Sequence, residues 1–133
     1  MTGNDEAAFE KQFAHGVELF NQKEFFDCHD AFEELWQEDR SERRLFLQGL
    51  IQAAVGSHHL SHGNTSGAIS QYNKSLDKLK QYADDYLGVD VANFRTEIER
   101  CLDGACLMHT KGVTYEVADT FFPELRRITI ITA

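Results

Sequence analysis

The sequence predicts an all-α fold, a single-domain bundle of about five helices built on antiparallel helical hairpins. Only one proline, Pro123, interrupts the 133 residues, so long helices are allowed almost everywhere. Apolar residues recur at helical spacing, and no long alternating strand pattern appears before Lys111. The chain is long enough for one domain with a hydrophobic core and too short for two ordinary ones. We therefore expect residues 1–133 to form one helical domain.

Apolar periodicity places the first helix at about residues 5–21 and the second at about 24–38. The apolar stripe of the first helix consists of Phe9, Phe13, Val17 and Phe20. Ser41 is the expected N-cap of the third helix, which ends near His62 before a Gly-Asn turn. The connection between the second and third helices is short, so these two helices should be antiparallel neighbours.

Thr65 or Ser66 is the expected N-cap of the fourth helix, and Asp90 is that of the fifth. Residues 112–133 should form an irregular C-terminal tail, with a short helical turn that begins at Pro123. The β-branched end of the tail, residues 128–131, is too apolar for an exposed segment. We expect it to pack along the bundle or to join two copies of the chain in a homo-oligomer.

The chain is acidic, with a formal net charge of -9. Nucleic acid is therefore an unfavourable partner, since such binding depends on neutralising phosphates with Lys and Arg. The charge argues equally against anionic membrane surfaces, and no apolar run approaches the ~20 residues of a membrane span. The first residues, from Met1 to Glu6, lack the features of a signal peptide, so a cytoplasmic location is expected.

The chain has three cysteines, Cys28, Cys101 and Cys106. An odd number in a chain of this size does not indicate a disulfide framework. The spacing of Cys101 and Cys106 fits neither a zinc ribbon nor a thioredoxin-like motif. We expect all three to be small, buried packing residues.

The second helix carries a histidine and a carboxylate on its apolar face. His29 and Glu33 are four residues apart, so one lies above the other, and Phe25, Phe32 and Trp36 share their face. Burial of this polar pair without partners would be costly. The pair must therefore be hydrogen-bonded, ligated to a metal or functional.

The third helix is apolar nearly all round, which is typical of a central, buried helix. Its polar residues fall on one narrow line, within about 40° at 100° per residue. These residues are Gln48, Gln52 and His59. The antiparallel arrangement should bring this line opposite His29 and Glu33.

A shift of 40 residues superimposes two parts of the chain weakly. It lays residues 23–28 over residues 63–68, Phe32 over Tyr72, and Trp36 over Leu76. Two helical hairpins of similar design, as in tetratricopeptide-like arrays, would account for this similarity. Two units are too few for a solenoid, so we interpret it as a similarity of packing.

Three stretches together resemble a known family, domain of unknown function 309, whose members are small all-helical proteins. The first runs from Phe13 to Trp36 and contains His29-Asp30-Ala31-Phe32-Glu33-Glu34-Leu35-Trp36, the second is Phe46-Leu47-Gln48-Gly49-Leu50-Ile51-Gln52, and the third comprises His59, Gly63-Asn64, Gly67-Ala68 and Leu76. The resemblance covers about residues 9–80. The usual pattern has Glu where this chain has Asp30. The resemblance implies an all-helical fold and no particular activity.

Six residues are expected to line a polar site between the second and third helices. They are His29, Glu33, Trp36, Gln48, Gln52 and His59. Glu33 with His29 and His59 offers the ligand types for a divalent metal such as Zn, Mn or Fe(II), although the His-Glu-x-x-His spacing is absent. Without metal, His29 and Glu33 are candidate catalytic residues as an acid–base pair. The structural alternative is a sealed hydrogen-bonded network that fixes helix register.

Two further features have ordinary structural explanations. His58 and His62 are also four residues apart, but they lie near a helix C-terminus, where capping and surface roles are expected. Trp36 is expected to be a core residue rather than a platform for a ligand.

Three functions follow from these alternatives. The first is a cytoplasmic module that binds a small polar ligand or a peptide at the six-residue site. The second is a metal-assisted hydrolase that uses the same residues. The third is a helical-hairpin interaction module whose polar network is purely structural.

Overall fold

The computed structural model describes residues 3–114 and 116–128, and these residues confirm an all-α bundle with a short irregular tail. The helices are α1 (Gly3–Asn21), α2 (Phe25–Glu38), α3 (Arg43–Ser61), α4 (Thr65–Leu79) and α5 (Val91–Lys111). A pair of two-residue strands, β1 (Asp85–Tyr86) and β2 (Val89–Asp90), precedes α5. A 3₁₀ turn, η1 (Asp119–Phe121), lies in the tail. No described helix is long and apolar enough to cross a membrane.

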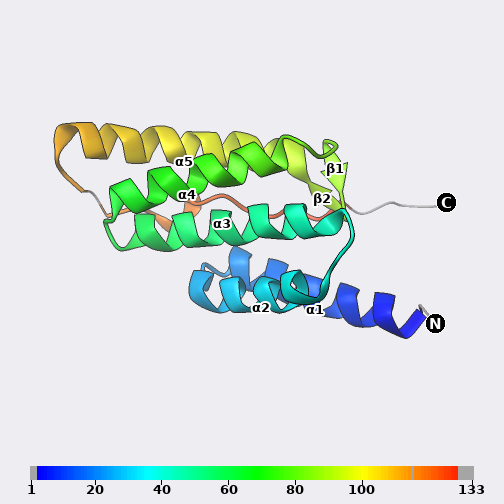
Figure 1. Ribbon diagram of the computed structural model, residues 1–133. Helices are drawn as coiled ribbons and strands as arrows, with labels where there is room; N and C mark the ends of the chain where they lie inside the picture. The colour runs from blue at the N-terminus through cyan, green and yellow to red at the C-terminus, as the bar shows by residue number, and fades with distance from the viewer. Residues whose placement is uncertain (1–2, 115, 129–133) are drawn as a thin grey trace.

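The helices pack in chain order, each against the next. α1 packs on α2, α2 on α3, α3 on α4, and α4 on α5. Figure 1 shows the resulting array, with the α1–α2 hairpin on one side of α3 and the α4–α5 pair on the other. The tail then runs back from the end of α5 toward the side of the molecule where both termini lie (Figure 1).

The 40-residue similarity corresponds to two matching helical hairpins. α2 and α4 begin at Phe25 and Thr65, which are 40 positions apart. The turns before them contain a left-handed residue at matching positions, Lys23 (φ 67°) and Gly63 (φ 75°). Equivalent hydrogen bonds close both turns, from Glu24 N to Leu19 O and from Asn64 N to His59 O. The α1–α2 and α3–α4 hairpins are therefore built to one plan.

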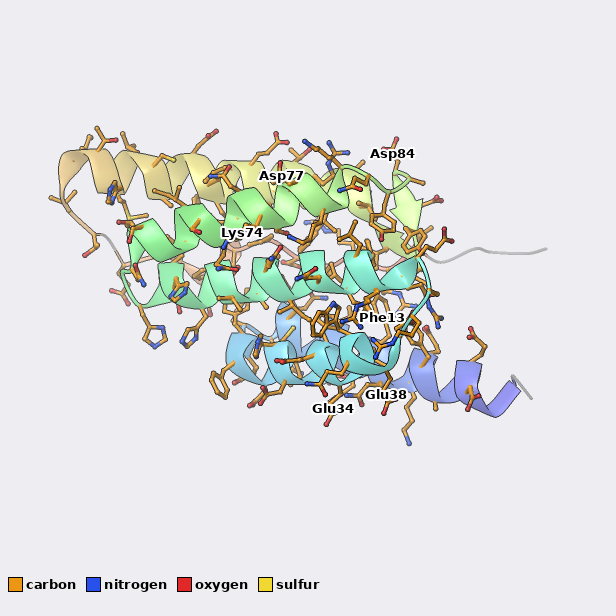
Figure 2. The ribbon with its side chains drawn as sticks, in the orientation of Figure 1. Phe13, Glu34, Glu38, Lys74, Asp77 and Asp84 are labelled. Atoms are coloured by element: carbon orange, nitrogen blue, oxygen red, sulfur yellow. The ribbon has the colours of Figure 1, made fainter. Side chains whose placement is uncertain are left out.

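Each hairpin also has one close contact between a glycine and an aromatic ring. A Cβ at Gly16 would overlap the ring of Phe32, and a Cβ at Gly56 would lie 2.9 Å from Tyr72 Cδ1. These two pairs are again separated by 40 positions. Next to the contact between Gly16 and Phe32, the ring of Phe13 packs against that of Phe32, in the core between the α1–α2 hairpin and α3 (Figure 2). Absence of a side chain at the glycines lets the helices of each hairpin approach closely.

The helix starts agree with the sequence expectations at α5 and differ at α4 and at α3, where the N-cap is Glu42 and not the expected Ser41. The side chain of Asp90 accepts a hydrogen bond from Asn93 N, which confirms it as the N-cap of α5. The N-cap of α4 is Asn64, whose side chain accepts from Gly67 N, so the expected caps Thr65 and Ser66 were wrong. Thr65 is instead buried, with its hydroxyl 3.0 Å from His109 Nδ1 of α5.

The tail differs from expectation at Pro123. The short turn lies earlier, at Asp119–Phe121, and no helix starts at Pro123. Side chains of α1 and α5 bind the backbone of Glu124 and Leu125, which keeps those groups out of a helical ladder. The tail packs along the bundle, with Leu125 buried and the backbone of Arg126 and Ile128 hydrogen-bonded to the β1–β2 hairpin, whereas Ile128 itself is 42% exposed. The rest of the β-branched stretch, residues 129–131, lies outside the described residues, and an oligomer formed through it stays a prediction.

The three cysteines are free thiols in different environments. Cys28 and Cys101 are buried, as expected, but Cys106 is exposed, so the expectation of a third packing cysteine was wrong. Burial raises the pKa of Cys28, and burial also raises the pKa of Cys101 to about 11. The two buried thiols are therefore protonated packing groups near neutral pH.

Candidate functional site

The centre of the candidate site is an imidazole between two carboxylates on α2. His29 Nε2 lies 3.1 Å from Glu33 Oε2, and His29 Nδ1 lies 3.3 Å from Asp30 Oδ1. The first pair spans one helical turn, as the four-residue spacing predicts. The side chains of His29 and Glu33 are 32% and 36% exposed, so solvent reaches both. The pair is therefore half-open to solvent.

A shallow groove follows the contact between α2 and α3, and we call it the α2–α3 groove. Its polar half, of about 170 Å³, is lined by His29, Glu33, Trp36, Gln48, Ile51 and Gln52. Its apolar half, of about 270 Å³, is lined by Phe25, Phe26, His29, Val55 and His58. His29 belongs to both halves. Five of the six expected site residues thus line one surface.

Two polar atoms beside this groove lack partners. The buried side-chain polar atoms without a hydrogen bond, among the described residues, are Trp36 Nε1, Gln52 Oε1 and Arg95 Nε. The first is a donor and the second an acceptor, and both residues line the polar half of the groove. Buried polar atoms are nearly always paired in folded proteins. An uncompensated donor and acceptor in one small region are therefore the groove's most unusual chemical feature.

Trp36 is held by α3 rather than free to move. The guanidinium carbon of Arg44 lies 4.0 Å from the centre of the indole ring, and Arg44 Nη1 donates to the carbonyl oxygen of Trp36 at 2.6 Å. This combination of a cation–π contact and a hydrogen bond fixes the end of α2 against the start of α3. Trp36 accordingly forms a rigid wall of the polar half.

The structure does not bring His59 to the groove. His59 Nδ1 lies 3.2 Å from Asn64 Nδ2 in the turn between α3 and α4, and its ring lies against Gly67 in the first turn of α4. His58 takes the expected place and lines the apolar half. The residues of α3 that line the groove are Gln48, Ile51, Gln52, Val55 and His58, so the line that faces α2 is shifted from Gln48 toward the Ile51 side of the helix. A projection centred on Gln48 could not show this shift.

The tautomer of His62 follows from its partners. Its Nδ1 lies 2.9 Å from the carbonyl oxygen of His58, and a carbonyl oxygen only accepts hydrogen bonds. Nδ1 of His62 therefore carries a proton and donates to this carbonyl oxygen. The His58 and His62 rings are 4.3 Å apart. Burial, together with the neighbouring His62 and His59, lowers the pKa of His58, which favours its neutral form at the end of the groove.

One set of side chains among the described residues has the atoms to hold a metal ion. Ligand atoms of His29, Asp30 and Glu33 lie within 4.8 Å of one another. Asp30 replaces His59 in the expected ligand set. The two carboxylates face different ring nitrogens of His29, so a metal at Nε2 would have Glu33 as a second ligand and Asp30 as an orienting partner of Nδ1. That arrangement supplies fewer protein ligands than the three of a typical catalytic zinc site.

Asp39, in the turn between α2 and α3, fixes the two helices that form the groove. Its Oδ1 accepts from Ser41 N at 2.7 Å and from Ser41 Oγ at 2.5 Å, and its Oδ2 accepts from Arg43 Nε at 2.9 Å. Burial by itself would raise the pKa of Asp39, but the hydrogen bonds from Ser41 and the charge of Arg43 outweigh it and lower the pKa. The sequence signal for this turn is an Asp two residues before a Ser, a pattern in which the Asp side chain binds the backbone two residues on.

The fold and the groove define an all-α helical-hairpin protein. The family model described as Domain of unknown function (DUF309) matches residues 13–71, so this part of the chain is similar to that family, which confirms the resemblance. The chain is also similar to the uncharacterized protein YpuF of Bacillus subtilis (strain 168), with 40% identity over 53 residues. The aligned segment covers 39% of this chain and 30% of that protein. All residues of the α2–α3 groove lie inside the family match, whereas α5 and the tail lie beyond it.

Proposed function

We propose that this protein is a peptide-binding module and that its recognition site is the α2–α3 groove. Support comes first from the shape of the groove. The groove consists of two depressions, of about 170 and 270 Å³, that follow each other along the surface between α2 and α3 and do not form one enclosed cavity. A peptide needs no enclosure, because it lies along a surface and places single side chains in shallow depressions.

The chemistry of the groove indicates which side chains it would take. The apolar half offers Phe26, which is 64% exposed, beside Val55. The polar half offers two acceptors, the Glu33 carboxylate and Gln52 Oε1. We therefore expect an apolar side chain in one half and a Lys or Arg side chain in the other.

Long-range electrostatics favour the same ligand. The chain has a net charge of -9, and α2 exposes further acidic residues, among them Glu34 and Glu38, on its side away from α3 (Figure 2). Such a surface steers cationic segments toward it. The single observation that carries the proposal is the position of His29 between an apolar and an acidic half of one groove.

Peptide display tests this proposal. A library of random peptides is selected on the intact protein, and the bound peptides are measured on Glu33→Gln and Phe26→Ala variants. We expect enrichment of a basic residue near an apolar residue, and at least a tenfold loss of affinity in each variant. Glu38→Gln, on the same helix but outside the groove, is the matched control and should bind normally. Absence of enrichment, or equal binding by all variants, would contradict the proposal.

A metal-assisted hydrolase is the second candidate, supported by the cluster of His29, Asp30 and Glu33. A bound metal would supply an activated water, and Glu33 would serve as a ligand or base. The test is metal analysis of protein purified without a histidine tag, together with melting in added zinc. Stoichiometric metal and a zinc-dependent rise in melting temperature, both lost in His29→Ala, would favour this candidate over peptide binding. The cytoplasmic location and the exclusion of nucleic acid remain predictions.

A further inference from the structure

A second groove, distinct from the α2–α3 groove, is filled by the chain's own tail. Residues 121–128 lie across α1, α2 and α5, and we call the surface beneath them the tail groove. Asn21, at the end of α1, binds the backbone of Leu125 twice. Its Nδ2 donates to Leu125 O at 2.9 Å, and its Oδ1 accepts from Leu125 N at 2.8 Å. A side-chain amide paired in this way recognises an extended main chain whatever its side chains are.

Helix α5 binds the tail backbone at two further places. Arg100 Nη2 and Cys101 Sγ both donate to Phe121 O, at 2.6 and 3.1 Å. Glu97 Oε1 accepts from Glu124 N at 2.8 Å. Together with Asn21, these side chains bind main-chain groups over five consecutive residues. The tail backbone also pairs with the edge of the β1–β2 hairpin, where Asp90 N donates to Arg126 O at 2.9 Å, Ile128 N donates to Gly88 O at 2.6 Å, and Val89 forms a bridge with Arg127. Helix side chains and this short strand edge therefore hold the extended main chain together, and the strand edge does so by strand addition.

The groove also selects side chains of the tail. Phe122 and Leu125 are 4% and 1% exposed, and the ring of Phe122 lies 5.3 Å from that of Phe25. The two arginines that follow are paired with acidic residues of the body. Arg126 Nη2 lies 3.1 Å from Glu97 Oε2, and Arg127 Nη2 lies 2.6 Å from Glu10 Oε1. The contacts thus specify an aromatic residue, a leucine three positions later, and a basic pair directly after it.

Most of the described residues between α5 and η1 are exposed. Gly112, Val113, Thr114, Glu116 and Ala118 are exposed, and Gly112 adopts a left-handed conformation (φ 67°) that ends α5. The tail is therefore bound by its own contacts rather than by the path of the chain that leads to it. A peptide from another molecule would have to bind in the same way, through its own contacts alone.

We propose that the tail groove is a peptide-binding groove, and that it binds extended partner segments with the pattern of Phe122 to Arg127. The chain's own tail is its ligand in cis. A connection of this length gives the tail an effective concentration of about 1 mM, so a partner segment must compete with it. Phe25 borders both this groove and the apolar half of the α2–α3 groove, but the side chains that bind the tail backbone belong to Asn21 and α5, outside the α2–α3 groove.

A cleavable form of the full chain tests the proposal. A recognition sequence for a site-specific protease is inserted after Thr114, the protein is cut, and a fluorescent peptide of residues 116–133 is added. We expect the cut protein to exchange its tail for the peptide, and the uncut protein to bind it at least about 100-fold more weakly because of the tethered competitor. A peptide with Leu125→Ala should bind at least tenfold more weakly. Asn21→Ala in the cut protein should weaken binding at least fivefold, with the neighbouring Gln22→Ala as the matched control.

Circular dichroism on the cut protein tests whether the body stays folded without its tail. The proposal requires that the body keep its helical signal when the tail is separated by dilution and gel filtration. Loss of that signal would make the tail part of the core and overturn the proposal. A folded body that takes up no labelled peptide, or that binds the Leu125→Ala peptide equally well, would overturn it too.

Discussion

His29 Nε2 and Glu33 Oε2 lie 3.1 Å apart on α2, with both side chains about one third exposed. An ion pair at this degree of exposure contributes little to stability, typically about 0.2–1 kcal/mol. We therefore expect Glu33→Gln to change the free energy of unfolding by less than about 1 kcal/mol. Chemical denaturation of the wild-type protein and of Glu33→Gln at neutral pH measures this difference.

The same measurement separates a binding site from a structural network. A loss above about 2 kcal/mol in Glu33→Gln would mean that the carboxylate is a required member of a buried network. The function would then be that of an interaction module whose polar residues only fix helix register. Unchanged or raised stability would indicate that Glu33 is retained for a role other than folding.

The Asp39 carboxylate should make stability depend on pH in a defined direction. Because its pKa is lowered in the folded protein, its contribution is fully present above the ordinary pKa of about 3.9 and is lost as the pH falls through the folded value. We expect Asp39→Asn to cost about 1–3 kcal/mol at pH 7, since it breaks charged hydrogen bonds to Ser41 and Arg43. The difference between wild type and variant should shrink below about pH 4.

Asp77→Asn is the matched control for this effect. Asp77 pairs with Lys80 at 3.4 Å, but its side chain is 73% exposed. Its replacement should leave stability at pH 7 nearly unchanged. An equal cost for both variants, or a difference for Asp39→Asn that does not change as the pH is lowered, would rule out the buried turn as the cause.

Local rules predicted the order and approximate bounds of the helices, because apolar periodicity and caps such as Asp90 act within a few residues. The pairing of His29 with Glu33 followed from the same short-range geometry. Short-range geometry could not predict that His58, and not His59, lines the groove, since this depends on the angle at which α2 crosses α3. Local rules could not predict the conformation of the tail either. Its conformation at Leu125 is set by Asn21, and the two are separated by 104 positions in the chain.

A buried hydrogen bond between α3 and α4 provides a further test of packing. Ser57 Oγ and Tyr72 Oη lie 2.7 Å apart, and both side chains are fully buried. Tyr72→Phe would leave the serine hydroxyl without this partner, at a cost of about 1–3 kcal/mol. Removal of both hydroxyls in Ser57→Ala/Tyr72→Phe should cost less than the sum of the single changes. A double-mutant cycle by denaturant unfolding measures the coupling, and strict additivity would mean that the two groups do not interact.

The glycine contacts of the two hairpins predict a ranked pair of variants. A methyl group at Gly16 would overlap the Phe32 ring, whereas one at Gly56 would lie 2.9 Å from Tyr72 Cδ1. Overpacking typically costs about 1–3 kcal/mol, while alanine gains up to about 1 kcal/mol over glycine in a helix. We expect both Gly16→Ala and Gly56→Ala to be destabilising, with the larger loss at Gly16.

Relief of the overlap should reverse the effect at Gly16. Phe32→Leu by itself removes buried apolar surface and should destabilise the protein. In the Phe32→Leu background, however, Gly16→Ala no longer meets an aromatic ring, so its additional cost should fall to near zero or become a gain from helix propensity. Thermal melts of the four proteins measure this. If Gly16→Ala cost the same in both backgrounds, its effect would arise from the backbone of α1 rather than from the contact with α2.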